Sequence, residues 1–315
     1  MKRTVTSMLA GLALAAAGTF AHAEEWKPSG PIKMFIAFAA GGGADTQARM
    51  IAAELEEAKG WKIIPEQATG KGGLNAVKAL AGEPKDGTAI AMIVTETLGY
   101  NSAAAGTAGP DAATPITTTA SSQMAVVALK EKGYKTLADV IEAAKGGETI
   151  RFGTMSPALS DLAYIIGKEN GVEFNIVQVR GGRAVMNGLN AGDMDVGFGA
   201  GIQAKAVAAG DMIELASAKS GKLASSPDAP LLSDFGVEFT NDTMFLIVGP
   251  AGMDETARDA IAAAIAQVLQ KDGSKAKGFI DKGFGGVNMV QGEELKKMIA
   301  DAHAQADGLL AASAE

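Results

Sequence analysis

The chain has 315 residues, of which 40 are glycine, two are histidine and none is cysteine, and its formal net charge is −8. Without cysteine it can form no disulfide framework, zinc–thiolate site, iron–sulfur cluster or thiol nucleophile. The acidic balance argues against a nucleic-acid partner, because phosphates are bound by clustered lysine and arginine. A hydrophobic fraction of 47% and a charged fraction of 20% indicate a globular chain long enough for two domains.

Residues 1–23 have the pattern of a secretory signal peptide. The chain begins with Met1-Lys2-Arg3, continues with a short apolar run and reaches a small-x-small cleavage site at Ala21-His22-Ala23. A membrane-spanning helix needs about 20 apolar residues, more than this alanine-rich run has. We therefore predict cleavage after Ala23 and export to the periplasm. His303 is then the only histidine left, and its charged, alanine-rich surroundings predict a surface position.

Strands alternate with helices from residue 31 onward. The first set comprises a strand at 31–38, a helix at 46–59, a strand at 61–65, a helix ending at 81 and a strand at 88–94. Residues 114–123 are rich in Thr, Ser and Ala and show no clear period. The second set comprises strands at 124–129, 150–154, 174–179 and 194–198 and helices at 136–145, 160–170 and 184–191.

A connector leads from the second set to a last strand and three helices. These elements are a strand at 244–248 and helices at 255–270, 275–282 and 293–310. Thr136 is the predicted N-cap of its helix, with Asp139 three residues later. Alternation of this kind is typical of parallel sheets with crossover helices. Two sets of alternating strands and helices, followed by a late strand with its helices, favour a two-lobed α/β protein whose chain returns to its first lobe.

Glycine clusters stand at the turns between the predicted strands and helices. The clusters are Gly41-Gly42-Gly43, Gly70-Lys71-Gly72-Gly73, Gly153-Thr154-Met155-Ser156, Gly181-Gly182-Arg183 and Gly199-Ala200-Gly201. The first N–H groups of a helix are unpaired and its dipole is positive there, so such a turn can bind an anion without a charged side chain. A purely steric role for each glycine is the alternative.

The nucleotide-binding motifs are incomplete at these turns. Thr46 stands where Gly-x-Gly-x-x-Gly requires its third glycine, and Gly70-Lys71-Gly72 lacks the Gly-Lys-Ser/Thr ending of a phosphate loop. Asp45 is either a ligand contact or the N-cap of the following helix. Arg180 and Arg183 could pair with a carboxylate in a bidentate way.

Four segments, in order along the chain, carry a resemblance to a known family. They are Pro31–Arg49 with its glycines and Asp45, Glu66–Gly87 with the second glycine cluster, Tyr134–Lys145, and Val177–Asp195 with Arg180-Gly181-Gly182. These segments resemble the periplasmic solute-binding proteins of tripartite tricarboxylate transporters, also called the Bug family.

The resemblance implies a periplasmic binding protein type II fold, with the ligand cleft between two α/β lobes. Lobe 1 would comprise residues 24–122 and 242–315, and lobe 2 would comprise residues 123–241. The implied function is the capture of a small organic carboxylate, a di- or tricarboxylate, for the membrane subunits of a transporter. A monomer without cofactor, metal or catalytic residues would suffice for this task, so we do not expect an enzyme.

Family members are described as holding a carboxylate with backbone amides and hydroxyls of their glycine loops. The ligand-binding residues that this implies are Ala40, Gly41, Gly42, Gly43, Asp45, Thr46, Thr69, Gly70, Lys71, Gly72, Gly73, Thr154, Ser156, Arg180, Gly181, Arg183 and Gly199. Val179-Arg180 stands where the family usually has Tyr-Lys, and Gln67-Ala68-Thr69 where it has Asn-Arg-Pro. These departures leave the identity of the carboxylate open.

Two other functions fit parts of the sequence. The same receptor could present its ligand-bound state to a two-component system, as a periplasmic sensor. An exported enzyme, such as a Rossmann-type oxidoreductase, is opposed by the incomplete glycine motif and the single remaining histidine.

Overall fold

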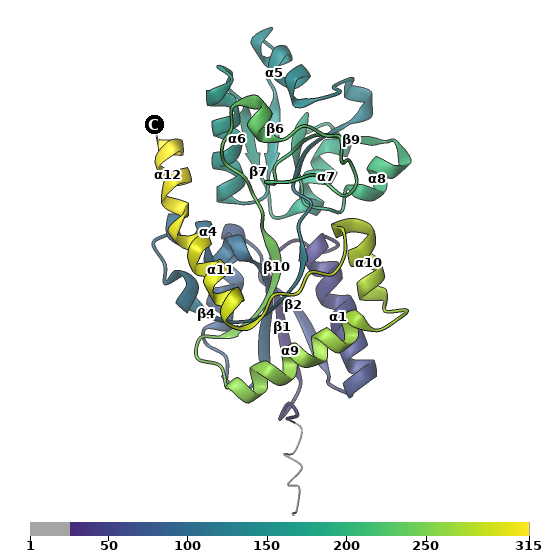
Figure 1. Cartoon of the computed structure of the whole chain (residues 1–315), viewed down its shortest axis with the longest axis vertical. Coiled ribbons are helices and arrows are strands. Elements are labelled where there is room, and N and C mark those ends of the chain that lie inside the picture. Colours follow the sequence, from purple (N-terminus) through teal and green to yellow (C-terminus); the bar gives the residue numbers. More distant parts are fainter. Residues whose placement is uncertain (1–25, 315) are drawn as a thin grey trace, which may run out of the picture.

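The computed structural model describes residues 26–314, so the predicted signal peptide and its cleavage site after Ala23 lie outside the described residues. Two five-stranded sheets form the centres of two lobes, which are stacked along the long axis of the molecule (Figure 1). The strand order is β2-β1-β3-β10-β4 in one sheet and β7-β6-β8-β5-β9 in the other. The predicted two-lobed α/β architecture is confirmed.

The first lobe is built on the sheet that contains β1. Its strands are β1 (Ile32–Ile36), β2 (Ile63–Gln67), β3 (Ala89–Val94), β4 (Ala113–Ser121) and β10 (Met244–Pro250). Its helices are α1 (Gly43–Lys59), α2 (Leu74–Leu80), α3 (Thr95–Leu98), α4 (Tyr100–Ala104), α9 (Glu255–Gln270), α10 (Lys275–Phe284) and α11 (Gly292–Ala304). β1 pairs in parallel with β2 and β3, and β10 runs antiparallel between β3 and β4. Every residue of β3 and β10 is buried, because helices cover both faces of this sheet.

The second lobe surrounds one large apolar core. Its strands are β5 (Ala125–Leu129), β6 (Arg151–Thr154), β7 (Asn175–Gln178), β8 (Val196–Gly199) and β9 (Met212–Ser217). Its helices are α5 (Leu137–Lys145), α6 (Pro157–Glu169), α7 (Gly182–Ala191) and α8 (Ala204–Ala209). β6 pairs in parallel with β7 and β8, and β5 is antiparallel to both β8 and β9. Phe152 and Phe198 pack against each other at its centre, with ring centroids 5.0 Å apart.

The chain passes between the lobes twice, after β4 and before β10, and its last helix then contacts both. Helix α12 (Ala306–Ala314) packs against α6 of the second lobe and α4 of the first. Tyr100 of α4, Ala158 of α6 and Ala306 form a small buried cluster at this junction. Figure 1 shows α12 beside the place where the two lobes meet. The C-terminal segment therefore adds a contact between lobes that the sequence pattern does not indicate.

The Thr-rich stretch without a clear period is a central part of the first lobe. It forms β4, in which Thr117, Thr118 and Thr119 are completely buried. Burial is tolerated because their hydroxyls are paired: Thr118 Oγ1 donates to Asn288 O and Thr119 Oγ1 donates to Gln47 Oε1, at 2.9 and 2.7 Å. The pattern also misses the short helices α3, α4 and α8 and the strand β9.

Several helix boundaries differ from the predicted ones. α1 begins three residues before Thr46, and α6 begins at Pro157, directly after its N-cap Ser156, where proline at the first helical position is favourable. The helix predicted at 293–310 is interrupted at Gln305 and forms α11 and α12. The predicted helix start at Thr136 is confirmed, and Asp139 accepts a hydrogen bond from its backbone N–H.

The surface position predicted for His303 is wrong. Its ring is half-buried, with Nδ1 3.1 Å from Gly99 O and 3.2 Å from Ser102 Oγ. A Cβ atom at Gly109 would lie 2.7 Å from this ring, so the ring fits here because residue 109 has no side chain. His303 thus serves to attach α11 to α3 and α4.

Asp195 joins three segments of the second lobe. Arg151 donates to both carboxylate oxygens, at 2.9 and 2.8 Å, and Lys132 Nζ donates from 2.7 Å. Burial by itself raises the pKa of Asp195, but the hydrogen bonds from Arg151 and Lys132 outweigh it and hold that pKa well below its usual value. A carboxylate with a depressed pKa stabilises the fold above its unfolded pKa and loses this contribution as the pH falls.

We expect Asp195→Asn to lower the free energy of unfolding by about 2 kcal/mol at neutral pH, because a buried carboxylate loses its charge-assisted hydrogen bonds to two partly exposed cations. Urea denaturation of both proteins should give the same difference at pH 7 and pH 5, and a smaller one below about pH 4, where Asp195 of the unfolded chain begins to protonate while the folded carboxylate stays ionised. The exposed neighbour provides the matched control, Asp193→Asn, for which we expect almost no change. A difference that stays constant to pH 3 would contradict the role given to Asp195.

Candidate functional site

The carboxyl ends of the parallel strands of both sheets lie at the cleft between the lobes. Strands β1 and β3 of the first lobe and β6 and β7 of the second each end at a loop whose residues line cavities there. Ligands of open α/β sheets generally bind at these strand ends. The cleft is therefore the candidate site.

Three adjoining cavities make up the cleft, and we name them by their position. The loop cavity, about 590 Å³, is lined by the second glycine loop, Thr69–Gly73, and by Arg180. The central cavity, about 50 Å³, shares Phe38 and Met155 with the loop cavity. The hinge cavity, about 400 Å³, is lined by the connector residues 238–243 and by α11 and α12. It shares Glu96 and Thr243 with the central cavity, which thus lies between the other two.

Three helices begin at the central cavity. Gly42, the N-cap of α1, lines it together with Ser156, the N-cap of α6, and Gly182, the first residue of α7. Ser156 Oγ accepts the N–H of Leu159 at 3.3 Å, and neither glycine N-cap, at α1 or at α7, has a side chain to offer. The positive ends of three helix dipoles from two lobes therefore meet at one small, mostly apolar space, which favours an anion.

Asp45 supports the first glycine loop. Its carboxylate accepts hydrogen bonds from Gly41 N and Arg49 Nε, both at 2.9 Å, and from Gln67 Nε2 at 2.5 Å. The side chain is almost completely buried and lines none of the three cavities. The N-cap of α1 is Gly42, so that Asp45 is not the cap. It ties the loop to α1 and β2, which holds the amides of the loop in place.

The second glycine loop has an unusual backbone. Gly70, Gly72 and Gly73 have positive φ, and among residues 26–314 Lys71 is the one non-glycine residue with positive φ, at 49°. The carbonyl of Gly72 accepts Thr97 Oγ1 at 2.8 Å and Asn101 Nδ2 at 3.1 Å. A left-handed lysine is strained, and the surrounding bonds keep it there. This loop faces the loop cavity with Lys71 on its rim.

Two hydrogen bonds join the glycine loops of the two lobes directly. Ala39 N donates to Arg180 O at 3.0 Å, and Arg183 Nε donates to Gly41 O, also at 3.0 Å. Gly181 has φ 106°, and a Cβ there would lie 3.2 Å from Ala39 N. A side chain at this position would hold the lobes apart.

A third polar contact between lobes lies at the hinge cavity. Tyr100 of α4 donates its hydroxyl to Asp161 of α6. Burial first, and the hydrogen bond to Asp161 second, raise the pKa of Tyr100, so the hydroxyl keeps its proton as a donor. This hydrogen bond and the two bonds between the glycine loops hold the lobes in a closed arrangement.

The structure brings many of the implied ligand residues together, in two neighbouring cavities. Those that line the central cavity are Gly42, Gly43 and Ser156, and those that line the loop cavity are Thr69, Gly70, Lys71, Gly72, Gly73 and Arg180. The other implied residues line none of the three cavities: Ala40, Gly41, Asp45, Thr46, Thr154, Gly181, Arg183 and Gly199. Thr154 is fully buried and bonded to Ser160 Oγ at 2.8 Å, and Gly199 is packed against Gln203.

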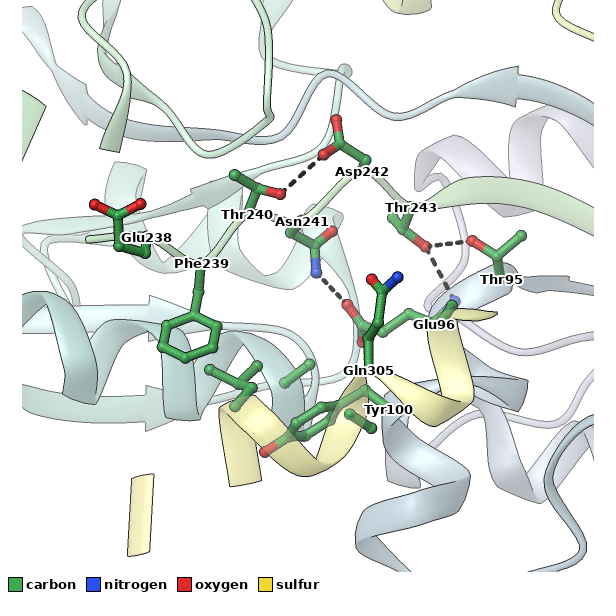
Figure 2. A pocket seen from close by; sticks show the side chains of 14 residues that line it. Thr95, Glu96, Tyr100, Glu238, Phe239, Thr240, Asn241, Asp242, Thr243 and Gln305 are labelled. Carbon is green, nitrogen blue, oxygen red and sulfur yellow. Dashed lines mark hydrogen bonds between the residues drawn. The ribbon is translucent and has the colours of Figure 1, made fainter. Parts of the chain in front are cut away.

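Sequence reasoning missed the polar residues deepest in the cleft. Glu96, Asn101 and Asn241 are all buried, and Glu96 lines two cavities. Figure 2 shows Asn241 directed at the Glu96 carboxylate, with Thr243 next to it. A signal for Glu96 was present, because it follows the predicted strand at 88–94 almost directly and strand ends of this kind line ligand sites. No such signal marked Asn241, which lies in the connector.

Comparison with known proteins decides the family. A sequence model of TctC, the tripartite tricarboxylate transporter family receptor, matches residues 47–314. The chain belongs to this family. It is 24% identical over 293 residues to a UPF0065 protein of Bordetella bronchiseptica, covering 88% of this chain and 84% of that protein. The resemblance to the Bug family is thereby confirmed.

Two solved structures share the fold of this chain over most of its length. MatC from Rhodopseudomonas palustris with bound malate has a TM-score of 0.76 and 20% identity, covering 90% of this chain and 100% of its own. Rpa4515 of R. palustris with adipate has a TM-score of 0.79 and 19% identity, and the match covers 91% of this chain and 98% of Rpa4515. The predicted fold class of this TctC receptor is confirmed.

Neither a metal centre nor a membrane-spanning helix is found within residues 26–314. No group of three or more His, Asp or Glu side chains in this range is arranged to hold a metal ion. In the same range, no helix has both the length and the apolar character that crossing a membrane requires.

We expect Gly72→Ala to destabilise this receptor by about 2 kcal/mol. The new Cβ would lie 2.3 Å from Asn101 Nδ2 on a backbone with φ 60°. Thermal denaturation measures the effect, and Gly82→Ala is the matched control, since Gly82 is exposed, has no positive φ and has open space around it. Equal stability of the two variants would mean that the glycine loop relaxes freely.

Proposed function

We propose that the protein is a periplasmic receptor that captures a small organic carboxylate between its lobes and delivers it to the membrane subunits of a tripartite transporter. The observation that carries this proposal is the convergence of three helix N-termini from both lobes on one cleft. Membership of the receptor family supports the transport role. The basic and apolar start of the chain supports export.

Backbone amides would do most of the binding in this proposal. One carboxylate would bind at the first turns of α1, α6 and α7, where N–H groups lack partners within their helices. Lys71 and Arg180, on the rim of the loop cavity, would attract the anion toward a chain whose net charge is negative. A ligand that bridges both lobes would stabilise the closed arrangement relative to an open one.

The bound ligands of the structural relatives support a carboxylate. MatC is described with malate and the protein Rpa4515 with adipate, which are both dicarboxylates. Both proteins have the same two-lobed fold, but at 20% identity or less their ligands do not transfer residue by residue. For this chain, therefore, we propose the chemical class and leave the particular carboxylate to experiment.

Isothermal titration calorimetry of the mature protein against a panel of organic carboxylates tests the proposal. After unfolding and refolding to remove any ligand carried through purification, we expect at least one carboxylate to bind with a Kd in the micromolar range or below. Parallel titrations with neutral sugars should give no heat. If no carboxylate binds, the proposed function is wrong.

We expect Arg183→Ala to weaken the carboxylate that binds best in this panel by about threefold to tenfold, because one hydrogen bond between the lobes is lost. Small-angle scattering of the same variant should detect a more open ligand-free form. Lys205→Ala, which removes an exposed cation from the same lobe, is the control and should leave affinity almost unchanged. Equal affinities of the two variants would remove Arg183 from the closure mechanism.

A further inference from the structure

Glu96 places a buried negative charge at the inner end of the cleft. Only 9% of the residue is exposed, and both carboxylate oxygens accept hydrogen bonds, one from Asn101 Nδ2 at 2.9 Å and the other from Asn241 Nδ2 at 2.5 Å. No Lys, Arg or His within residues 26–314 forms an ion pair with it. A buried charge without a counter-charge is costly, so a compensating group is expected nearby.

The side-chain amides of Asn101 and Asn241, which donate to Glu96, each have an oxygen that accepts no hydrogen bond. Because their NH₂ groups face the carboxylate, Asn101 Oδ1 and Asn241 Oδ1 are buried and have no hydrogen-bond partner. Asn101 is 1% exposed and lines the loop cavity, and Asn241 is 9% exposed and lines the hinge cavity. Buried polar atoms are nearly always paired, so these oxygens point to a missing donor.

The cleft is also polarised from one end to the other. Lys71 and Arg180 line the loop cavity, which has no acidic residue in its lining. The hinge cavity has Glu96, Glu238 and Asp242 in its lining and no basic residue. Glu238 and Asp242 are exposed at the rim, where Asp242 is bonded to Thr240, so Glu96 is the acidic group that faces inward (Figure 2).

The central cavity connects the two ends through a narrow, apolar passage. Its lining includes Phe38, Met155, Leu159, Phe245 and Phe284, and its volume is about 50 Å³. The donors of the three helix starts can hold a carboxylate in this space, and its apolar side chains suit the short aliphatic chain of the same ligand. Glu96 lines this cavity as well, so a second polar group of the ligand would lie toward Glu96 and the hinge cavity.

We propose that the ligand carries a cationic hydrogen-bond donor, an ammonium group, at the end remote from its carboxylate, and that Glu96 binds this group. The inference rests on the proposed function, since the carboxylate end is placed at the helix N-termini and the cations Lys71 and Arg180. The ammonium would donate to Glu96 and to the free amide oxygen of Asn241, two residues that both line the hinge cavity. A second carboxylate at this end would instead face a buried negative charge and an amide oxygen that lacks a donor.

Pairs of ligands that differ only in the terminal group test this assignment. In each pair an ammonium replaces a methyl group of the same size: γ-aminobutyrate with pentanoate, δ-aminovalerate with hexanoate, and ε-aminocaproate with heptanoate. In calorimetry on the wild-type protein, we expect the amino member of at least one pair to bind about tenfold tighter than its partner. It should also bind tighter than glutarate and adipate, the dicarboxylates with the same number of methylene groups as γ-aminobutyrate and δ-aminovalerate.

Glu96→Gln keeps the shape of the side chain and removes its charge. We expect this variant to reduce the difference within the best pair to less than about threefold. Glu238→Gln removes the same charge from the exposed rim of the hinge cavity and is the matched control, in which the difference should persist. If Glu96→Gln does not fold, the wild-type comparison decides alone.

The outcomes separate this inference from the function on which it rests. Tighter binding of glutarate or adipate than of every amino member overturns the ammonium site and leaves the carboxylate receptor intact. A preference for ammonium that Glu96→Gln does not change overturns the role of Glu96. The absence of binding by every carboxylate overturns the proposed function and this inference together.

Discussion

The unpaired N–H groups at the helix starts are the constraint on which this protein depends. Three helices from two lobes begin at one cavity, and each start needs a loop small enough to let the backbone approach a ligand. Glycine fills that need at α1 and α7, and Ser156 caps α6. The scarcity of histidine and the absence of cysteine are compatible with the proposed site, because backbone amides would supply its donors.

Closure brings these amides together, and separate small contacts between the lobes hold it. Backbone and side-chain bonds of Ala39 and Arg183 join the glycine loops, while Tyr100 and the last helix α12 join the lobes at the hinge cavity. Because each contact is small, the balance between open and closed lobes can be shifted by the binding energy of a small molecule. The molecule suits capture and release better than permanent binding.

Sequence patterns predicted most of the long elements, since their apolar residues recur with a clear period. They failed where tertiary structure overrides local preference. β4 is polar in sequence, yet Thr118 and Thr119 are buried in it, because hydroxyl partners come from Asn288 and from Gln47 of α1. The surface position predicted for His303 is wrong for the same reason. Its neighbours in the sequence are charged or small, but its ring contacts Gly109 and Ser102 from a distant part of the chain.

The sequence by itself determined the class of the molecule: alternating strands and helices, glycine loops at strand ends, and the segments that mark the receptor family. Such features are local, so they can be recognised without knowing what lies next to them. Only the tertiary structure decided which residues meet in the cleft. Glu96, Asn101 and Asn241 are distant in sequence or carry no motif, and their contact exists because the chain returns from the second lobe through the connector. Residues of both lobes acquire a common environment only when the lobes close.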